Sequence, residues 1–591
     1  MPDDKISPRK KQKLMGHALV QEGVITAKQL RFVLKEQRKV GRDKKEMLGE
    51  ILVRSGMVDE SRMINFLEKF LGIPYVRLRQ IENIDIDAVK MIPETMARHF
   101  KVLTIGLNKK TNKLIVVMAN PFDIVALDTI RMRTGYEIEK CFSQTKDIEE
   151  VVDRIYAEQS MQKSVSEFVD IKTAEEEEVE AALPKKTGYE LEAEAVKTPV
   201  IEFVDSLLKN AVQKRASDIH VEPREDRLGI RFRIDGILRE MIPPPKQMES
   251  AILTRLKLLG NMDIAEQRLP QDGRFKFDFK GRSIDIRMAS SPTIHGEKLV
   301  LRILDKASLL INMEDLGMSA RNVEDFKTVL EQSYGMVLVT GPTGSGKTTT
   351  LYSALNYINK PDKNIVTIED PVEYQLKGVN QIQTKHHIGL TFSAGLRTVL
   401  RQDPDIIMIG EVRDLETLEN AVKASLTGHL VLSTIHTNDA PSVVLRLMHM
   451  GLESYLISSC LSLVIAQRLV RKICTYCKEK VALSPAMVHV LEKRVNIDLR
   501  RVSFYHGKGC DRCLNTGFLG RAGLFEFLMI SKRVKQAIIE NPSEEELKKI
   551  AREEGMLTVF QHGIEKVNEG ITTIEEILRV TVLEKSDINR A

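Results

Sequence analysis

The pattern of hydrophobic and polar positions separates helical stretches near both ends of the chain from mixed stretches between them. Apolar residues recur at helical spacing over 28–37, 60–71 and most of 526–591. Short runs with strand character cover 102–106 and 113–118. The pattern therefore predicts a multidomain α/β chain with a helical module toward each end.

The middle of the chain carries two further strand-rich stretches. A helix is predicted from Thr198 to about Lys214, and alternating strands follow over 219–222, 229–234 and 283–288. After Leu316 the order becomes strand, glycine-rich loop, helix and strand again. This order predicts a parallel sheet with crossover helices.

The N-terminal part contains a repeat. The segment MGHALVQEGVI begins at Met15, and LGEILVRSGMV begins at Leu48, 33 residues later. Because about three repeats are needed to bury a continuous core, two copies predict a small helical module rather than a solenoid. The acidic run Glu175–Glu178 stands in a poorly apolar segment that predicts a mobile linker, with a solvated helix as the alternative. The predicted domains are a helical repeat module (1–72), a small α/β domain (73–157), an acidic flexible linker (158–195), a second α/β domain (196–305), a P-loop domain (313–470), a tetracysteine module (471–525) and a helical C-terminal domain (526–591).

Composition and charge limit the function classes. The 591 residues leave room for about four domains. Lys plus Arg is 88 and Asp plus Glu is 83, so the formal net charge of +5 argues against a general phosphate-coating role. No apolar run approaches the ~18 residues of a spanning helix. The opening MPDDKISPRKKQK has no apolar segment behind its charges, so we expect a cytoplasmic protein without a secretory signal.

A glycine-rich segment carries the clearest candidate chemistry. The apolar run 336–340 leads directly into GPTGSGKT, and a helix is predicted over 349–357. Strand, G-x-x-x-x-G-K-[ST] and helix in this order are typical of a loop that binds nucleotide phosphates, whereas the alternative is an ordinary glycine-rich turn. Lys347 would reach the β- and γ-phosphates, and Thr348 would coordinate Mg²⁺. The predicted phosphate loop consists of Gly341, Pro342, Thr343, Gly344, Ser345, Gly346, Lys347 and Thr348.

Hydrolysis also needs carboxylates, and two acidic segments follow at predicted strand ends. The strand 365–368 leads into Glu369-Asp-Pro-Val-Glu373, and the strand 405–409 leads into Gly410-Glu411. Strand ends beside a phosphate loop are where ligands collect in open α/β sheets. Because Gly410 stands where a magnesium-binding strand usually has Asp, Glu411 must serve the metal. Helix caps or surface acids are the alternatives for both segments.

Two histidines flank the next predicted strand. His429 and His436 stand at the ends of HLVLSTIH. A single histidine beside a buried strand is more often a core residue than a catalyst. A functional role for His429 and His436 is therefore supported only through the segments around them.

Four of the six cysteines form two C-x-x-C pairs. Cys474 and Cys477 are separated from Cys510 and Cys513 by 32 residues. Four thiolates satisfy tetrahedral Zn²⁺ without an open position, so the pattern predicts a structural zinc site. The intervening loop is longer than the usual zinc spacing, and a metal-free loop or a redox pair is the alternative.

Taken together, these segments resemble a known family, the secretion ATPases that power type II secretion and type IV pilus assembly. The resemblance implies a RecA-like P-loop core, a preceding PAS-like N2-type domain, an N1-type domain and a zinc-binding insertion. It covers the chain from about Thr198 onward and the N-terminal part more loosely. The similar boxes are GPTGSGKT (341–348), TIEDPVEY (367–374), LRQDPDIIMIGEVRD (400–414), TGHLVLSTIHTN (427–438), ASDIHVEP (216–223) and RFRIDG (231–236).

The resemblance implies a Mg²⁺-dependent ATPase and a role for each box. Lys347 and Thr348 would hold phosphate and Mg²⁺. Glu373 would be the general base that orients water, and Glu411 would be the Walker B acid. His429 and His436 would belong to the box that couples the nucleotide state to domain movement. Four arginines would reach a neighbour's nucleotide, with a solvated strand face as the alternative for the last two: Arg397, Arg401, Arg231 and Arg233.

Arginines that act in trans require a neighbour, so the resemblance implies a homohexamer. Its motion would act on an inner-membrane platform protein, and the N1-type domain would dock to a membrane-anchored protein. The chain would then be cytoplasmic and peripherally associated with the inner membrane. The tetracysteine insertion and the lack of an AIRNLIRE-like segment favour assembly or export over retraction. Pilus extension and type II secretion both remain open.

The N-terminal module resembles a domain that binds cyclic di-GMP in some members. That domain opens each repeat with Arg-Leu-Gly, whereas Leu14-Met-Gly16 and Met47-Leu-Gly49 lack the arginine. An arginine would stack on guanine or pair with phosphate, so its absence counts against dinucleotide binding.

Two other hypotheses come from different function classes. A nucleic-acid-stimulated RecA-like motor would need a basic, aromatic-rich groove, yet aromatics are 5% and Trp is absent. A nucleotide-gated scaffold that barely turns over is disfavoured by the presence of both Glu373 and Glu411.

Overall fold

The computed structural model describes residues 18–39, 51–52, 55–78, 84–108, 111–153, 155–156, 198–305, 312–483, 488, 491 and 502–581. The chain divides into two units, Met1–Ser160 and Met161–Ala591. The predicted linker 158–195 and the segments 14–16 and 47–49 lie outside the described residues. The seven predicted domain boundaries stay predictions.

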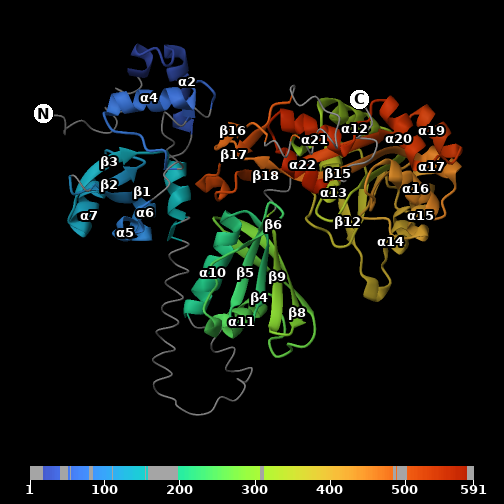
Figure 1. The fold of residues 1–591 in the computed structure, drawn as a ribbon, viewed down its shortest axis with the longest axis horizontal. Helices are drawn as coiled ribbons and strands as arrows, with labels where there is room; N and C mark the ends of the chain where they lie inside the picture. The colour runs from blue at the N-terminus through green and yellow to red at the C-terminus, as the bar shows by residue number, and fades with distance from the viewer. Residues whose placement is uncertain are drawn as a thin grey trace, which may run out of the picture. The chain divides into compact units, whose positions relative to one another are not determined.

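The first unit contains short helices and a three-stranded sheet in the order β1-β2-β3 (Figure 1). The helices predicted at 28–37 and 60–71 and the strands predicted at 102–106 and 113–118 are confirmed. Strand β3 (Glu137–Phe142) was not predicted, because charged residues interrupt its short apolar pattern. Its parallel pairing with β2 gives this segment its strand conformation. The other elements are α2 (Ala27–Lys39), α4 (Glu60–Leu71), α5 (Ile86–Lys90), α6 (Glu94–Phe100), β1 (Val102–Asn108), β2 (Lys113–Met118) and α7 (Ile124–Thr134).

The second unit begins with a six-stranded antiparallel sheet in the order β6-β5-β4-β9-β8-β7. Helices α10 (Thr198–Gln213) and α11 (Glu249–Leu259) pack against the sheet in one apolar core (Figure 1). Lys257 of α11 is 2% exposed, and its Nζ donates to both carboxylate oxygens of Glu297 at 2.9 and 3.0 Å. The strands are β4 (Ala216–Pro223), β5 (Leu228–Ile234), β6 (Ile237–Glu240), β7 (Gln271–Phe279), β8 (Arg282–Thr293) and β9 (Gly296–Leu304).

A seven-stranded sheet forms the largest part of the second unit, in the order β12-β11-β13-β14-β10-β15-β18. All neighbours are parallel except β15 and β18. The predicted parallel sheet is therefore confirmed. The strands are β10 (Gly335–Thr340), β11 (Ile365–Glu369), β12 (Asn380–Gln383), β13 (Ile406–Ile409), β14 (Leu430–Ile435), β15 (Leu461–Ile473) and β18 (Phe518–Met529).

Strand β10 is buried on both faces. Met336 and Leu338 belong to a core shared with helices α14 to α17, whereas Val337 and Val339 belong to a core shared with α12 and α13. Continuous apolar strands of this kind are typical of parallel sheets that helices cover on both sides. The helices are α12 (Ala320–Leu330), α13 (Lys347–Ile358), α14 (Phe392–Val399), α15 (Leu415–Leu426), α16 (Pro441–His449) and α17 (Ser454–Cys460).

Four helices follow β18 among the described residues, in agreement with the helical spacing of this part of the sequence. Helices α21 and α22 pack against β18 and β15, whereas α19 and α20 pack against α17 and α16. Glu576 of α22, whose side chain is 3% exposed, accepts hydrogen bonds from Arg471 at 2.7 Å and Arg579 at 2.8 Å. Because Arg471 belongs to β15, this charged cluster ties the last helix to the sheet. The elements are β16 (Lys478–Lys480), β17 (Tyr505–Gly507), α19 (Lys532–Ile539), α20 (Glu544–Glu553), α21 (Val559–Asn568) and α22 (Ile574–Val580).

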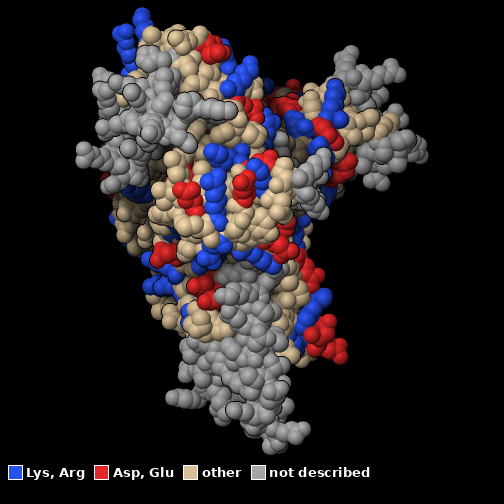
Figure 2. All heavy atoms as spheres, turned by 90° about the vertical axis from the view of Figure 1, so that its left-hand side faces the viewer, with Lys and Arg blue, Asp and Glu red and all other residues tan. Residues whose placement is uncertain are grey.

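The surface carries charges of both signs. On the face drawn in Figure 2, Lys and Arg lie among Asp and Glu. This distribution agrees with the small formal net charge of +5. No helix among the described residues combines the length and the apolar character that crossing a membrane requires.

Candidate functional site

The predicted phosphate loop connects β10 to α13, in the strand–loop–helix order that the sequence indicated. Gly341 and Gly346 have φ angles of 148° and 89°. A Cβ on Gly341 would lie 2.4 Å from the carbonyl oxygen of Gln467, and one on Gly346 would lie 2.9 Å from Gln467 Nε2. Thr350 of α13 donates to Gln467 Oε1 at 2.8 Å. Strand β15 thus supports the loop so closely that only glycine fits at these two positions.

Lys347 lies across this loop. Its Nζ donates to the carbonyl oxygens of Gly341 at 2.8 Å and Pro342 at 3.2 Å. Burial lowers the pKa of the Lys347 ammonium; the charge of Glu411 opposes this shift, and the charge of Arg468 adds to it. Thr348, the next residue, is exposed. A partly buried cation on a glycine-rich loop is suited to an anionic ligand.

Glu411 follows β13 at the same edge of the sheet. The register pairs Ile368 with Ile409 and Ile409 with Ser433, so the carboxyl ends of β11, β13 and β14 meet there. The Glu411 side chain is 18% exposed, forms an ion pair with Arg413 and lies 3.6 Å from His436 Nε2. Glu411 and His436 are therefore brought together with the phosphate loop, as the strand-end argument predicted.

Glu369 ends β11 in a buried hydrogen-bond network. The carboxylate is 3% exposed and accepts from the hydroxyl of Tyr352, from Thr367 Oγ1 and, at 3.0 Å, from Gln381 Nε2. Gln381 also donates to the carbonyl of Tyr374 at 3.1 Å. Since Tyr352 belongs to α13, the network ties the helix after the phosphate loop to the segment that carries Glu373.

The second acid of that segment, Glu373, contacts the six-stranded sheet. Arg287 of β8 donates from Nη1 to Glu373 Oε2 at 3.1 Å and from Nη2 to the carbonyl oxygen of Val372. Both side chains of the ion pair are 33% exposed. The sequence did not single out Arg287, because it lies outside every motif. The only signal for Arg287 in the sequence is its polar position in a strand whose residues alternate between buried and less buried.

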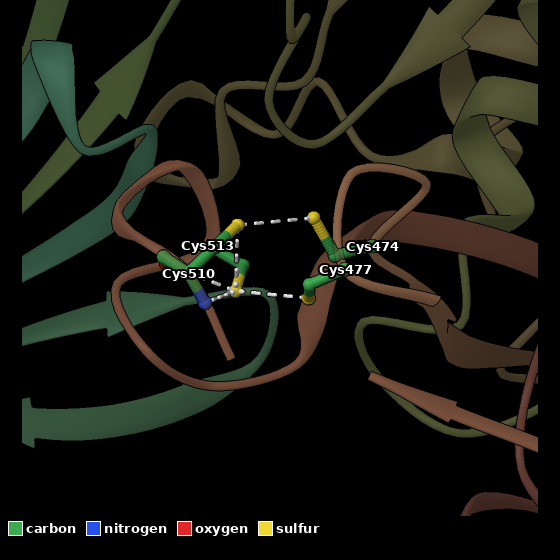
Figure 3. Close-up of side chains that lie close together, drawn as sticks. All are labelled: Cys474, Cys477, Cys510 and Cys513. Carbon is green, nitrogen blue, oxygen red and sulfur yellow. Dashed lines mark hydrogen bonds between the residues drawn. The ribbon is translucent and has the colours of Figure 1, made fainter. Parts of the chain in front are cut away.

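Four cysteines form a separate cluster. Figure 3 shows the sulfur atoms of Cys474, Cys477, Cys510 and Cys513 facing one another from two loops, and all lie within 4.8 Å of one another. Three of the sulfur–sulfur distances are 3.7, 3.7 and 3.9 Å. A tetrahedral zinc with Zn–S bonds of ~2.3 Å would place its thiolates about 3.8 Å apart. The donor set and the spacing therefore fit a structural zinc ion.

The surroundings of these sulfur atoms also suit thiolate ligands. Burial raises the pKa of the Cys474 thiol to about 12. Burial acts in the same direction on Cys513, but hydrogen bonds from the amides of Cys510 and Gly517, each at 3.2 Å, lower its pKa overall. Amides that point at sulfur are typical partners of metal-bound thiolates. A metal cation would supply the charge that keeps the more buried thiols deprotonated.

Comparison with known proteins gives the family. Residues 193–579 match the family described as type II/IV secretion system protein. The chain belongs to this family. Residues 71–162 match the MshEN domain.

Relatives match along most of their length. Type IV pilus assembly ATPase PilB of Myxococcus xanthus is 43% identical over 568 residues, covering 95% of this chain and 98% of that protein. Type II secretion system protein E of Xanthomonas campestris is 40% identical over 543 residues, covering 90% and 92%. The crystal structure of the pilus retraction motor PilT with bound ADP covers 65% of this chain and 98% of that chain, at 26% identity and a TM-score of 0.44. The family match and the first two relatives identify the chain as a P-loop ATPase related to proteins of pilus assembly and type II secretion.

Within this ATPase, three residues predicted for the site lie elsewhere. His429 precedes β14, at the end opposite His436, and its Nδ1 lies 2.9 Å from the carbonyl oxygen of Ala424. Arg231 donates to Glu222 at 2.8 Å within the six-stranded sheet. Arg233 lies 3.5 Å from Asp218 of the same sheet. These three side chains therefore do not join the phosphate loop in this chain, and their predicted roles stay predictions.

The other two predicted arginines, Arg397 on α14 and Arg401 just after the end of that helix, are exposed. Arg397 pairs with Glu416 of α15, and Arg401 donates to the carbonyl oxygen of Arg397 at 2.7 Å. Their exposure is compatible with the predicted contact to a neighbouring subunit, which stays a prediction.

Proposed function

We propose that this ATPase drives the assembly of type IV pili or type II secretion pseudopili through an inner-membrane platform protein. The relatives named for pilus assembly and for type II secretion support this function. The observation that carries it is the ion pair between Glu373 and Arg287. This pair joins an acid at the nucleotide edge to a different sheet, so that chemistry at the loop can be coupled to movement of that sheet.

The phosphate loop residues would hold the nucleotide. Lys347 would exchange its hydrogen bonds with the Gly341 and Pro342 carbonyls for bonds to phosphate oxygens. The exposed Thr348 hydroxyl and Glu411 would hold Mg²⁺, the latter directly or through water. When bound, Mg²⁺ neutralises charge on the β- and γ-phosphates.

Glu373 would act as the general base. Its carboxylate would orient a water molecule and accept a proton as that water attacks the γ-phosphate. While Arg287 donates to Glu373, that carboxylate oxygen is occupied by the guanidinium and cannot accept a hydrogen bond from the attacking water. Arg287 would therefore have to release Glu373 before hydrolysis.

A homohexamer would place Arg397 and Arg401 at a neighbour's nucleotide. The exposure of Arg397 on α14 and of Arg401 just beyond that helix supports this arrangement. For Arg231 and Arg233, a trans-acting role requires that their pairs with Glu222 and Asp218 open first. His429, at the far end of β14, would act through that strand rather than by touching nucleotide.

The cysteine cluster would hold a structural Zn²⁺. The sulfur spacing and the amide hydrogen bonds to Cys513 support this assignment. With four thiolates the ion would have no open position, so it would stabilise the loops and take no part in hydrolysis.

Protein contacts would recruit the ATPase to the inner membrane. We infer docking of the N-terminal unit to a membrane-anchored protein, and we do not propose cyclic di-GMP as its ligand because both repeat segments lack the arginine. A nucleic-acid motor has less support: the relatives reported above are named for pili and secretion, and charges of both signs are interspersed on the drawn face (Figure 2).

A complementation experiment tests the motor function in cells. The gene is deleted and restored as wild type or as Lys347→Ala, and surface pili and secreted enzymes are scored together. Loss of pili alone, without rescue by Lys347→Ala, assigns pilus extension, and loss of secretion alone assigns export. Equal rescue by both genes would contradict a motor function.

A second experiment tests the base in the purified chain. Glu373→Gln should lower kcat for ATP hydrolysis by about 10²- to 10⁴-fold while ATP still binds, because the amide does not accept the proton. Glu324→Gln, an exposed acid of α12, is the matched control and should keep the wild-type rate. A wild-type rate in Glu373→Gln would remove the base assignment.

A further inference from the structure

Arg468 lies beside the phosphate loop, although no motif includes it. Strand β15 runs parallel to β10, and the register pairs Thr340 with Ala466. The next residues of β15 therefore flank the first loop glycine. The Nη1 atom of Arg468 lies 3.1 Å from the place that a Cβ on Gly341 would occupy. Its guanidinium thus forms part of the wall of the loop.

The hydrogen bonds of this guanidinium go to main-chain carbonyls. Nη1 donates to the carbonyl oxygen of Gln467 at 3.1 Å, and Nη2 donates to that of Asn438 at 2.8 Å. Carbonyl oxygens accept hydrogen bonds but do not neutralise a charge. Burial lowers the pKa of Arg468, while the more distant acids Glu526 and Asp439 act against that shift. Since arginine ordinarily titrates above pH 12, Arg468 stays charged at neutral pH.

Two cations consequently meet at the loop. Lys347 Nζ lies 2.8 Å from the Gly341 carbonyl oxygen, on the same glycine that Arg468 flanks. Burial lowers the pKa of Lys347, and the positive charge of Arg468 adds to that shift because like charges at close range disfavour each other. A ligand with several negative charges would relieve this repulsion. A planar guanidinium binds phosphate oxygens through two parallel hydrogen bonds, whereas a lysine acts as a point charge.

We propose that Arg468 binds a phosphate of the nucleotide held by its own subunit. The inference deepens the proposed nucleotide site and rests on it. The group differs from the arginines predicted to act in trans, because β15 and the phosphate loop belong to one sheet of one chain. Lys347 and Arg468 would hold the phosphates from two sides of the loop.

Binding would also change a second segment. The Arg468 bond to the Asn438 carbonyl is one that a phosphate oxygen would replace. Asn438 lies in the segment after His436, which Asp439 ties to Lys548 at 2.9 Å and Ala440 ties to Glu526 at 2.8 Å. Phosphate binding would thus release one attachment of this segment, while the bonds of Asp439 and Ala440 and the bond from the Thr437 amide to Thr340 Oγ1 at 2.7 Å remain.

Nucleotide affinity of the purified full chain tests the proposal. Calorimetric titration with a non-hydrolysable ATP analogue should give a Kd about 10- to 100-fold weaker for Arg468→Gln than for wild type, the loss expected for a hydrogen bond between charged groups. The Kd of Arg468→Lys should lie between those of wild type and Arg468→Gln, because lysine keeps the charge but cannot form the two parallel hydrogen bonds of a guanidinium. Lys472→Gln, a cation on the same strand beyond the loop, is the control and should bind like wild type. A Kd for Arg468→Gln within twofold of wild type would overturn the proposal.

Lys347→Ala in the same titration separates this proposal from the nucleotide site itself. If Lys347→Ala weakens binding and Arg468→Gln does not, only the role of Arg468 fails; if neither weakens binding, the site fails. If Arg468→Gln does not fold, a protection experiment on the wild-type chain tests the proposal instead. The nucleotide analogue should then slow modification of Arg468 by phenylglyoxal at least tenfold, measured on peptides by mass spectrometry. An equal rate with and without nucleotide overturns the proposal.

Discussion

Removal of the Tyr352 hydroxyl tests the buried hydrogen-bond network that holds the segment from Glu369 to Glu373. Tyr352→Phe deletes one of three donors to the buried Glu369 carboxylate and keeps the ring, whose centroid lies 4.5 Å from that of Tyr374. A hydrogen bond to a charged group contributes about 1.5–3 kcal/mol, and the two remaining donors, Thr367 and Gln381, still solvate the carboxylate. We therefore expect the free energy of local opening to fall by about 1.5–3 kcal/mol.

Hydrogen exchange measures this change in the full chain. For peptides spanning 365–376, the loss corresponds to exchange that is about 10- to 150-fold faster. Glu373 lies four residues beyond Glu369, so kcat for ATP hydrolysis should fall as well. The KM for ATP should change little, because Tyr352 faces Glu369 rather than the loop.

Tyr357→Phe provides the matched control on the same helix. Its hydroxyl donates to the Glu331 carboxylate at 2.6 Å, but this pair is exposed. Exposed polar pairs contribute about 0–1 kcal/mol, so exchange and kcat should both stay near wild type. If Tyr352→Phe and Tyr357→Phe gave the same exchange rates and the same kcat, burial of the Glu369 network would not be what orders this segment.

Three further changes test other parts of the structure. Cys474→Ser should remove zinc and expose the cysteine loops to hydrogen exchange, since structural zinc contributes roughly 10–16 kcal/mol in small sites. Cys460→Ser changes a buried cysteine outside the cluster and should keep the metal. Elemental analysis that finds no zinc in the wild-type protein would contradict the site. Burial acts to raise the pKa of Glu576, but hydrogen bonds from its two arginine partners lower it to about 2. The folded value lies below the unfolded value near 4.3, so this contribution to stability is present above pH ~5 and is lost as the pH falls toward 2. Glu576→Gln should flatten that part of a plot of unfolding midpoint against pH, and an unchanged plot would argue against the cluster. Lys257→Met should lower stability by about 3–5 kcal/mol, because it leaves Glu297 buried and unpaired. The double variant Lys257→Met with Glu297→Leu should recover most of that stability. Hydrogen exchange in β9 measures the stability of both variants, and an equal loss in the single and the double variant would refute the reasoning.

The sequence pattern predicted the structure correctly where residues close together in the chain determine it. The helices at 28–37 and 60–71 and the strand–loop–helix at the phosphate loop were predicted because apolar spacing and glycine positions act over a few residues. The cysteine pairs were predicted for the same reason, since each C-x-x-C turn presents two sulfur atoms by itself.

The tertiary structure decided which distant residues share the site. Strand β3 became visible only through its pairing with β2, because its own sequence is too charged to stand out. Arg287 contacts Glu373, and Arg468 lies beside Gly341, because β8 and β15 pack against segments that are distant in sequence. Arg231 and Arg233, which the family resemblance suggested as groups acting in trans, pair with Glu222 and Asp218 within their own sheet, and a contact with a neighbouring subunit stays a prediction.

The sequence by itself determined the family, the α/β class and the chemistry of the phosphate loop, because these depend on residue types at short, regular spacings. Only the tertiary structure decided that Arg468 lies beside the loop, that Glu369 is buried and that Arg287 of another sheet contacts Glu373. These choices depend on strand order and register, since residues more than a hundred positions apart, such as Gly341 and Arg468, come into contact only when the sheet forms.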